Sequence, residues 1–476
     1  MVLDQTISIN RYFEEIASIP HGSFHEEKIA DYIEQFAKDH QLKYIRDKYN
    51  DVIIYKKASK GYEDHETVML QAHIDMVCEK NNDVDFDFST DGLKLYIEDG
   101  WLHARGTTLG ADDGVGVAYM LSILEDITLK HPALECVFTV QEEVGLIGAM
   151  HMKADYFKAT RMINLDGGGE VSTTTTSSGG RYQYIEREVM LIDNQKPCYQ
   201  LSVTGLLGGH SGGCIDLERG NSIKIAFRVM NDLLKNNMDI QLGNITGGLK
   251  ENAIPRECIV EFASNSSFEQ IENIINKSYK EIYGELEFSD KDVTIKVSKI
   301  NQFNQVMCPH CSHDIIKIFY LIPNGFMHKS MAMPGLTYAS MNLGKIRVEE
   351  NKVLASYCTR SPLESMKNEM CNQVSEIAEI FGAKTWIEND FCGWGYVENS
   401  PLRNKLKEIL AKQGKELECN ATHGGLETGI FKGILPDLDI ITYGPIAYGC
   451  HTPDEKLDLS SYLRSYNNLL LLLEVL

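Results

Sequence analysis

Apolar residues recur with helical and strand-like spacing in alternation over the first 165 residues of the chain. Their spacing predicts helices over residues 7–19, 25–41 and 114–127. Short apolar runs predict a strand pair within residues 41–57 and buried strands over 67–71, 134–140 and 162–165. Because strands alternate with helices, we expect an α/β layered domain here.

The pattern changes after TTTTSSGG, residues 173–180, which lacks periodicity and large apolar side chains. We expect this segment to be a hinge between domains. A β-α-β-β-α-β order follows, with strands expected over 199–204, 239–246, 257–263 and 292–298 and helices over 221–236 and 268–283. A weaker second pass has helices expected over 312–321 and 364–381 and strands over 337–344, 352–359 and 384–389, with the 292–298 strand as a candidate for sharing.

Beyond residue 389 the expected elements return to the α/β layer. They are a helix over 400–413, a strand over 439–443 and a helix over 460–475. A chain of 476 residues is also too long for a single core. We therefore expect residues 1–182 and 390–476 to form one domain, into which residues 183–389 are inserted as an α+β domain of two similar halves.

Charge and cysteine content narrow the class of protein. The formal net charge of −22 argues against nucleic acid or an anionic membrane as a partner. The N-terminal segment is amphipathic and acidic, unlike a secretory signal, and no apolar run approaches the ~20 residues of a membrane helix. The 12 cysteines follow no framework pattern, so we expect reduced thiols and a cytoplasmic protein.

Side chains that can bind a metal follow the buried strands and glycine turns. They are His73 with Asp75, Asp112 beside Asp113, Glu142 with Glu143, Asp166 and, near the end of the chain, His451. Ligands gather at strand ends in open α/β sheets. A mixture of imidazole and carboxylate donors favours zinc or manganese over calcium or magnesium.

Five ligands are too many for one tetrahedral zinc ion but suit a pair of ions bridged by one carboxylate. Such a pair lowers the pKa of a shared water to about 7, and a general base is then needed. Glu142 is the surplus acid and is expected to be that base, while Asp75 is expected to support the His73 imidazole. The alternative for the Asp112-Asp113 pair is a helix N-cap, and for Asp75 a turn residue.

Several motifs resemble one known family. They are HIDMV at 73–77, TLGADDGVG at 108–116, QEEVGLIGA at 141–149, NLDGG at 164–168, GLLGGHSG at 205–212, ENAIPRE at 251–257, HGGLETGIF at 423–431 and GCHTPDE at 449–455. They are similar to the aminoacyl-histidine dipeptidases (Xaa-His dipeptidases, peptidase D), within the dizinc metallopeptidase family that includes carnosinases and aminoacylases. The resemblance runs nearly end to end. It implies a zinc-peptidase-like catalytic domain, with helices flanking a mixed sheet, and an inserted α+β lid.

The resemblance also implies roles for individual residues. His73 and Asp166 would hold one zinc ion, Glu143 and His451 the other, and Asp112 would bridge them. Asp75 would be the supporting acid and Glu142 the general base, and the peptide bond after Asp112 would be cis. Asp113 stands where close relatives often carry Asn. In the lid, His210 and Asn252 would contact the substrate carbonyl, Arg360 the substrate carboxylate, and Gly425 the substrate through its backbone.

Other polar residues have simpler interpretations. Asn252 is a candidate turn former, Arg360 a candidate solvated charge, and His423 and Glu427 are expected to be hydrogen-bonded scaffold. The cluster Cys308-Pro-His-Cys311 resembles half of a zinc knuckle but lacks a second pair, so a loop and helix start are expected. His21 and His25 are expected at the surface.

The expected activity is hydrolysis of Xaa-His and other dipeptides by two Zn²⁺ per chain, with Mn²⁺ or Co²⁺ as substitutes. Hydrolysis of N-acyl amino acids is the alternative enzyme activity, and a non-catalytic binding protein on this scaffold is the third hypothesis. The sequence leaves a homodimer open. If the second half of the lid takes the place of a partner's lid, His210 acts on the metals of its own chain.

Overall fold

The computed structural model describes all residues, 1–476, and divides into two compact units. The first unit consists of Met1–Thr176, Trp394–Ala421 and Leu426–Leu476, and the second of Ser177–Gly393 and Thr422–Gly425. The division at 176/177 precedes the expected border at 182/183 because strand β9 (Gly179–Glu188) pairs along its length with β20 (Lys352–Ser361) of the second unit. Gly425, expected in the first domain by its position in the chain, belongs to the second unit.

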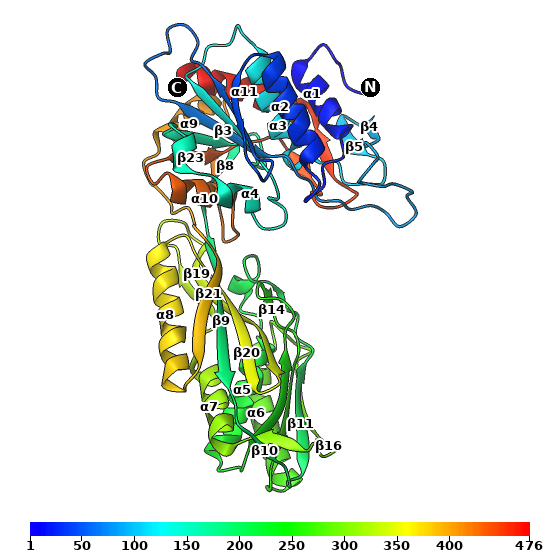
Figure 1. Cartoon of the computed structure of the whole chain (residues 1–476), viewed down its shortest axis with the longest axis vertical. Helices are drawn as coiled ribbons and strands as arrows, with labels where there is room; N and C mark the ends of the chain where they lie inside the picture. Colours follow the sequence, from blue (N-terminus) through cyan, green and yellow to red (C-terminus); the bar gives the residue numbers. More distant parts are fainter. The chain divides into compact units, whose positions relative to one another are not determined.

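The first unit has a mixed sheet and helices that pack against it (Figure 1). Its strands are β1 (Lys43–Arg46), β2 (Val52–Lys56), β3 (Val68–His73), β4 (Leu95–Glu98), β5 (Trp101–Ala104), β6 (Leu134–Thr139), β7 (Arg161–Asn164), β8 (Ser172–Ser177), β22 (Glu418–Thr422), β23 (Asp439–Thr442), β24 (Ala447–Tyr448) and β25 (Lys456–Asp458). Its helices are α1 (Ser8–Ala17), α2 (Glu27–Asp39), α3 (Ala111–Glu125), α4 (Ile147–His151), α9 (Pro401–Lys412), α10 (Glu427–Ile434) and α11 (Leu459–Val475).

The main sheet of the first unit has the strand order β1-β2-β6-β3-β7-β23. Strands β6, β3, β7 and β23 run parallel, β2 runs antiparallel to β6, and β1 runs antiparallel to β2. Every residue of β3 and β6 is buried, as the continuous apolar runs predicted for strands covered on both faces. The carboxyl ends of β6, β3 and β7 therefore meet at one edge, where the acids and His73 lie.

The second unit contains a nine-stranded sheet with four helices (Figure 1). Its strands are β9, β10 (Leu191–Asp193), β11 (Cys198–Thr204), β12 (Gly209–His210), β13 (Gln241–Gly247), β14 (Ala253–Ile254), β15 (Cys258–Ala263), β16 (Thr294–Ile300), β17 (Gln305–Met307), β18 (Gly325–Lys329), β19 (Thr337–Glu349), β20 and β21 (Lys384–Phe391). The helices are α5 (Ser222–Lys235), α6 (Phe268–Leu286), α7 (Pro309–Leu321) and α8 (Glu364–Ile380). Burial alternates along strands such as β11, because the helices cover one face of the sheet.

The two expected halves are present, but the second half begins differently from the prediction. The sheet order is β16-β11-β15-β13-β19-β20-β9-β21. In each half the first and third strands of the β-α-β-β-α-β unit are central, and β9, not the 292–298 strand, is the first strand of the second half. The first half is therefore inserted between β9 and α7. The halves join where β13 pairs antiparallel with β19, so they form one continuous sheet.

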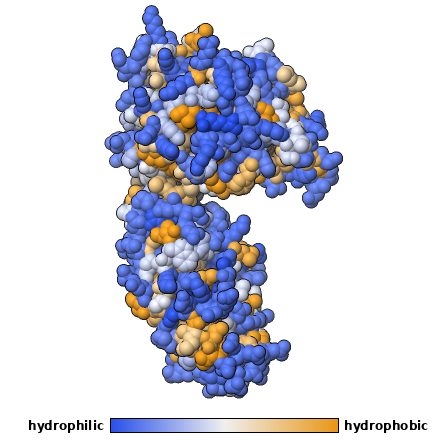
Figure 2. All heavy atoms as spheres, in the orientation of Figure 1, coloured by the Kyte–Doolittle hydropathy of each residue, from blue (hydrophilic) through white to orange (hydrophobic).

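The expected hinge, residues 173–180, contains the boundary between the two units at 176/177, but most of its residues form strands. Residues 172–177 form β8, which pairs with β22, and Gly179 begins β9. Threonine has high β-propensity, so a run of threonines forms a strand without large apolar side chains. The surface view in Figure 2 shows apolar residues scattered among polar ones on this face of the molecule. No helix combines the length and the apolar character needed to cross a bilayer.

Candidate active site

Three parallel strands of the first unit bring their C-terminal residues together. His73 is the last residue of β3, Glu142 and Glu143 follow β6, and Asp166 follows β7. Asp112 lies at the start of α3, where its φ/ψ values of −89° and 103° are non-helical. The regular helix begins just after Asp113, whose Oδ1 accepts a hydrogen bond from Gly116 N at 3.0 Å. Asp113 is therefore the residue that caps the helix, which leaves the Asp112 carboxylate available.

The Asp112 carboxylate lies between the two histidines. Its Oδ1 is 3.0 Å from His73 Nε2, and its Oδ2 is 3.2 Å from His451 Nε2. His451 Nε2 is also 3.1 Å from Glu143 Oε1. Ligand atoms of His73, Asp112 and Glu143 all lie within 4.8 Å of one another. The Asp112-Asp113 peptide is cis, as the resemblance implied, and His451 has a left-handed backbone with φ 65°.

The charge of this cluster is unbalanced. Its only ion-pair partners are His73 and His451, and neither Lys nor Arg pairs with its acids. Asp166 has no hydrogen-bond or ion-pair partner, and burial together with the negative charge of Asp112 raises its pKa well above the usual range. Hydrogen bonds to Asp112 and Glu143 raise the pKa of His451 to about 10. Crowded carboxylates, two imidazoles and an unpartnered acid are the donor set that fits divalent cations.

Asp75 connects His73 to the turn that carries Glu142 and Glu143. Its carboxylate accepts hydrogen bonds from Glu142 N at 3.0 Å, Glu143 N at 3.3 Å and the Ser23 hydroxyl at 2.7 Å. His73 Nδ1 lies 2.9 Å from the Asp75 carbonyl oxygen and 3.5 Å from its carboxylate. Ser23 was not among the expected residues, because no pattern in the sequence links it to Asp75.

The Glu142 side chain has no hydrogen-bond partner in the structure. Burial is the main cause that raises the pKa of Glu142 to about 7, and the charges of Glu143 and Asp112 add to it against the opposing effect of His73. The carboxylate is therefore close to its titration point at neutral pH.

In the second unit, His210 and Asn252 lie on neighbouring segments. His210 in β12 pairs with Ala253 in β14, and Ser211 N donates to Asn252 O at 2.8 Å. His210 is exposed, and partial burial and the charge of Arg360 lower its pKa. Two residues separated by 42 positions are thus brought side by side by a two-residue strand pair.

Arg360 is a buried cation without a carboxylate partner. It is 5% exposed, and its side chain makes one hydrogen bond, from Nε to Ser211 Oγ at 3.3 Å. In the sheet it lies between Ser340 of β19 and Gly180 of β9. This position corrects the alternative of a solvated strand-end charge.

His423 and Glu427 are hydrogen-bonded and buried, as expected of scaffold. His423 lies between the Ser178 hydroxyl at 2.8 Å and the Ser340 hydroxyl at 2.7 Å. Burial, with a contribution from Arg360, lowers the pKa of His423 to about 3, so its imidazole is neutral. Ser178 N donates to Gly424 O, next to Gly425. The Thr422–Gly425 segment is therefore held against the strand ends that carry Arg360.

Two other expectations concern residues that are not candidate ligands. Cys308 caps α7 through its sulfur and both Cys308 and Cys311 are buried, which agrees with a helix start. The expectation that His21 lies at the surface is wrong. His21 is 4% exposed, and Met76 N donates to its carbonyl oxygen at 3.2 Å, because the 19–22 segment packs against the residues after β3. His25 is exposed.

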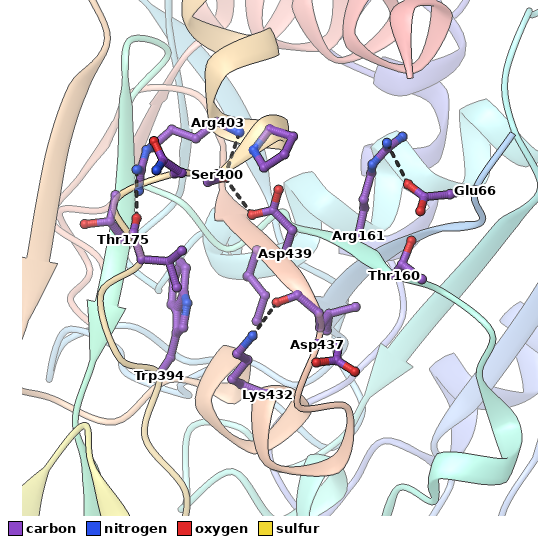
Figure 3. Close-up of a pocket in the computed structure, with 15 residues that line it drawn as sticks. Glu66, Thr160, Arg161, Thr175, Trp394, Ser400, Arg403, Lys432, Asp437 and Asp439 are labelled. Atoms are coloured by element: carbon purple, nitrogen blue, oxygen red, sulfur yellow. Dashed lines mark hydrogen bonds and ion pairs between the residues drawn. The ribbon is translucent and has the colours of Figure 1, made fainter.

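A hollow of about 330 Å³ lies at the opposite edge of the first unit's sheet (Figure 3). Arg161 and Asp439, the first residues of β7 and β23, line it. Arg161 pairs with Glu66 at 2.7 Å, and Asp439 accepts from the Ser400 hydroxyl at 2.6 Å. The charges of Arg161 and Asp439 are thus paired within the protein, unlike the unpartnered Asp166 at the other end of the sheet.

Comparison with known proteins identifies the family. The model of peptidase family M20/M25/M40 matches residues 69–475. The chain belongs to peptidase family M20/M25/M40. The matched region includes each residue of the strand-end cluster. This M20-family chain is a metallopeptidase, a hydrolase of peptide bonds, as the motifs predicted.

Individual relatives agree over nearly the whole chain. The M20-family chain is 32% identical to the cytosol non-specific dipeptidase of Escherichia coli (strain K12) over 455 residues, 94% of this chain and 93% of the relative. The crystal structure of aminoacylhistidine dipeptidase from Vibrio alginolyticus matches with a TM-score of 0.90 and 32% identity, covering 98% and 96% of the two chains. Aminopeptidase PepT from Bacillus cereus shares the fold alone, with a TM-score of 0.56 and 15% identity over 99% and 98%.

Proposed function

We propose that this chain is a cytoplasmic dipeptidase with two divalent metal ions, zinc by preference, that hydrolyses Xaa-His and other dipeptides. His73 and Asp166 would hold one ion, Glu143 and His451 the other, and Asp112 would bridge them. The carrying observation is that the two Asp112 oxygens each face a different histidine, at 3.0 and 3.2 Å. The names of the Escherichia coli and Vibrio relatives support the substrate class and the compartment.

The bound metals would supply an acidified water and polarise the scissile carbonyl. Glu142 would take the proton of the attacking water on its carboxylate and pass it to the nitrogen of the leaving amine. Asp75 would keep Glu142 in place, since it accepts the Glu142 backbone N–H. His210 and Asn252 would hydrogen-bond the carbonyl oxygen, and Arg360 would bind the free carboxylate of the dipeptide. The unpaired, buried Arg360 supports that role, because an incoming carboxylate matches its planar donors.

Metal removal tests the centre of this proposal. Dialysis against a chelator should abolish dipeptide hydrolysis, because the acidified water and the polarised carbonyl both depend on the bound ions. Reloading with Zn²⁺, Mn²⁺ or Co²⁺ separately should restore it, with about two ions per chain at saturation. Metal content is measured by atomic emission and activity over a panel of dipeptides with and without C-terminal His. Full activity in metal-free protein would refute the proposal.

Hydrolysis of N-acyl amino acids is the second candidate activity, since the same metal chemistry serves it. N-acetyl amino acids added to the panel separate the two, because a dipeptidase requires the free amino group of its substrate. Faster cleavage of the acylated compounds than of dipeptides would favour the second activity.

The continuous sheet of the second unit supports a site that is complete within one chain. The second half, joined to the first through β13 and β19, would take the place of a partner's lid. Mixing inactive His210→Ala chains with inactive Glu142→Gln chains under subunit exchange should then restore no activity. If His210 acted on a partner, up to about a quarter of wild-type activity would return, because half the pairs are mixed and each has one intact site.

A further inference from the structure

The Glu455 carboxylate connects the segment that carries Asp112 to the segment that carries His451. Glu455 is 2% exposed and lies four positions after His451. Its two oxygens accept hydrogen bonds from four consecutive backbone N–H groups at the start of α3. They are Leu109 N at 2.7 Å and Gly110 N at 3.0 Å on Oε2, and Ala111 N at 2.9 Å and Asp112 N at 3.4 Å on Oε1.

This arrangement solves a local problem in the turn before the regular helix, which begins after Asp113. The backbone N–H groups of Leu109 to Asp112 have no partner within that helix, and buried backbone N–H groups require an acceptor. Gly110, with φ 67°, has no side chain that can accept them. The Glu455 carboxylate accepts these hydrogen bonds instead, although it lies more than 340 residues away in the sequence. The backbone that aims the Asp112 carboxylate is therefore fixed from outside its own segment.

Glu455 and His451 belong to one tight turn. Thr452 N donates to Gly449 O at 3.1 Å, and Glu455 N donates to Thr452 O at 3.1 Å. The Thr452 hydroxyl also donates to Gly449 O, at 2.7 Å. Since the turn is bonded internally, a shift of Glu455 would be transmitted to His451. The turn therefore closes a ring in which the Asp112 carboxylate faces His451 and the Asp112 backbone is held by Glu455.

We propose that Glu455 is a positioning residue that sets the placement of Asp112 relative to His451 and thereby the metal affinity of the site. The inference rests on the proposed function, which makes both residues metal ligands. Partners that orient metal ligands typically contribute 10- to 100-fold in metal affinity or activity. Glu455 also places a negative charge close to the site, and this charge adds to the attraction for a cation.

Glu455→Gln tests the proposal. The amide oxygen can serve one pair of backbone N–H groups, but the amide nitrogen then faces the other pair as a second donor. Metal-free protein would be titrated with Zn²⁺ against a chelating indicator, and visible absorption of Co²⁺-loaded protein would report ligand geometry. We expect one zinc equivalent to bind roughly 10- to 100-fold more weakly than in wild type, with an altered Co²⁺ spectrum.

Glu135→Gln is the matched control. Glu135 is also buried, and it accepts backbone hydrogen bonds from Lys158 N at 2.8 Å and Ala159 N at 3.2 Å. It lies at the start of β6, at the end of the sheet opposite the site. This variant should lose folding stability but keep wild-type zinc affinity. If the role of Glu455 is purely structural, Glu455→Gln and Glu135→Gln will be alike in both folding stability and zinc affinity.

Zinc affinities of Glu455→Gln within twofold of wild type would overturn the proposal. If that variant does not fold, Glu455→Asp decides, because it keeps the charge but withdraws the oxygens by one methylene. Weaker zinc binding by Glu455→Asp supports the proposal, and binding within twofold of wild type overturns it. Wild-type protein that takes up no zinc would overturn both this inference and the proposed function, whereas zinc uptake by wild type with unchanged variants overturns the inference alone.

Discussion

Replacing Glu142 by Gln should remove dipeptide hydrolysis while about two metal ions stay bound to each chain. The variant keeps the shape of the side chain and the backbone N–H that donates to Asp75, but its amide cannot accept a proton. Loss of a general base costs roughly 10²- to 10⁴-fold in rate. Steady-state kinetics on a good dipeptide and metal analysis of the same sample measure both quantities. Near-normal turnover would contradict the assignment.

Glu143→Gln is the informative comparison, because it alters the adjacent carboxylate in the same turn. Glu143 Oε1 lies 3.1 Å from His451 Nε2, whereas no hydrogen bond or ion pair joins the Glu142 carboxylate to either histidine. We expect Glu143→Gln to lose metal as well as activity, and excess metal to restore part of its rate. Excess metal should leave Glu142→Gln inactive. Equal metal content and equal rescue in the two variants would show that the roles are not divided in this way.

Replacing Arg360 by Ala should raise KM for dipeptides strongly and change kcat less. A charge-assisted contact between a guanidinium and a carboxylate contributes about 1.5 to 3 kcal/mol, which corresponds to roughly 10- to 150-fold in KM. Dipeptide amides, which lack the terminal carboxylate, should be poor substrates of the wild type and nearly unaffected by the substitution. If wild-type enzyme cleaves amides as well as free dipeptides, Arg360 does not bind the carboxylate.

Arg347→Ala controls for the removal of a positive charge from the same sheet. Arg347 lies on β19 and pairs with Glu349, so its charge is already neutralised. It is also less buried than Arg360. Its loss should leave KM unchanged for dipeptides and for their amides. A parallel rise in KM in both variants would indicate a general effect of charge, not a specific contact with the substrate.

The cluster of His73 and the neighbouring acids was predictable because its residues follow local signals. His73 ends an apolar run, and the acids after β6 and β7 follow such runs closely. Each of these residues could therefore be recognised from the few positions before it. His451, 285 positions after Asp166, was a candidate because it follows a glycine turn, but its assignment to the same ion as Glu143 came only from the resemblance. The distances that place Asp112 between the histidines followed only from the fold.

The prediction failed where partners are distant and the local pattern is weak. Residues 179–188 alternate polar and apolar side chains only partly, and their role as the first strand of the second half depends on pairing with β20 and β21. The threonine run at 173–176 lacks apolar contrast, so it was interpreted as a hinge although it forms β8. Glu455 is the last residue of the motif GCHTPDE, yet its four backbone partners lie more than 340 positions away.

The sequence by itself therefore determined the layered fold, the two-half plan of the inserted unit, the candidate ligands and the family. Those features depend on the periodicity of apolar residues and on short motifs, which are local properties of a chain. Only the tertiary structure decided which strand opens the second half, that Arg360 is buried without an acid, and that Glu455 holds the Asp112 backbone. Each of these depends on contacts between segments far apart in sequence, and such contacts leave no trace in the spacing of neighbouring residues.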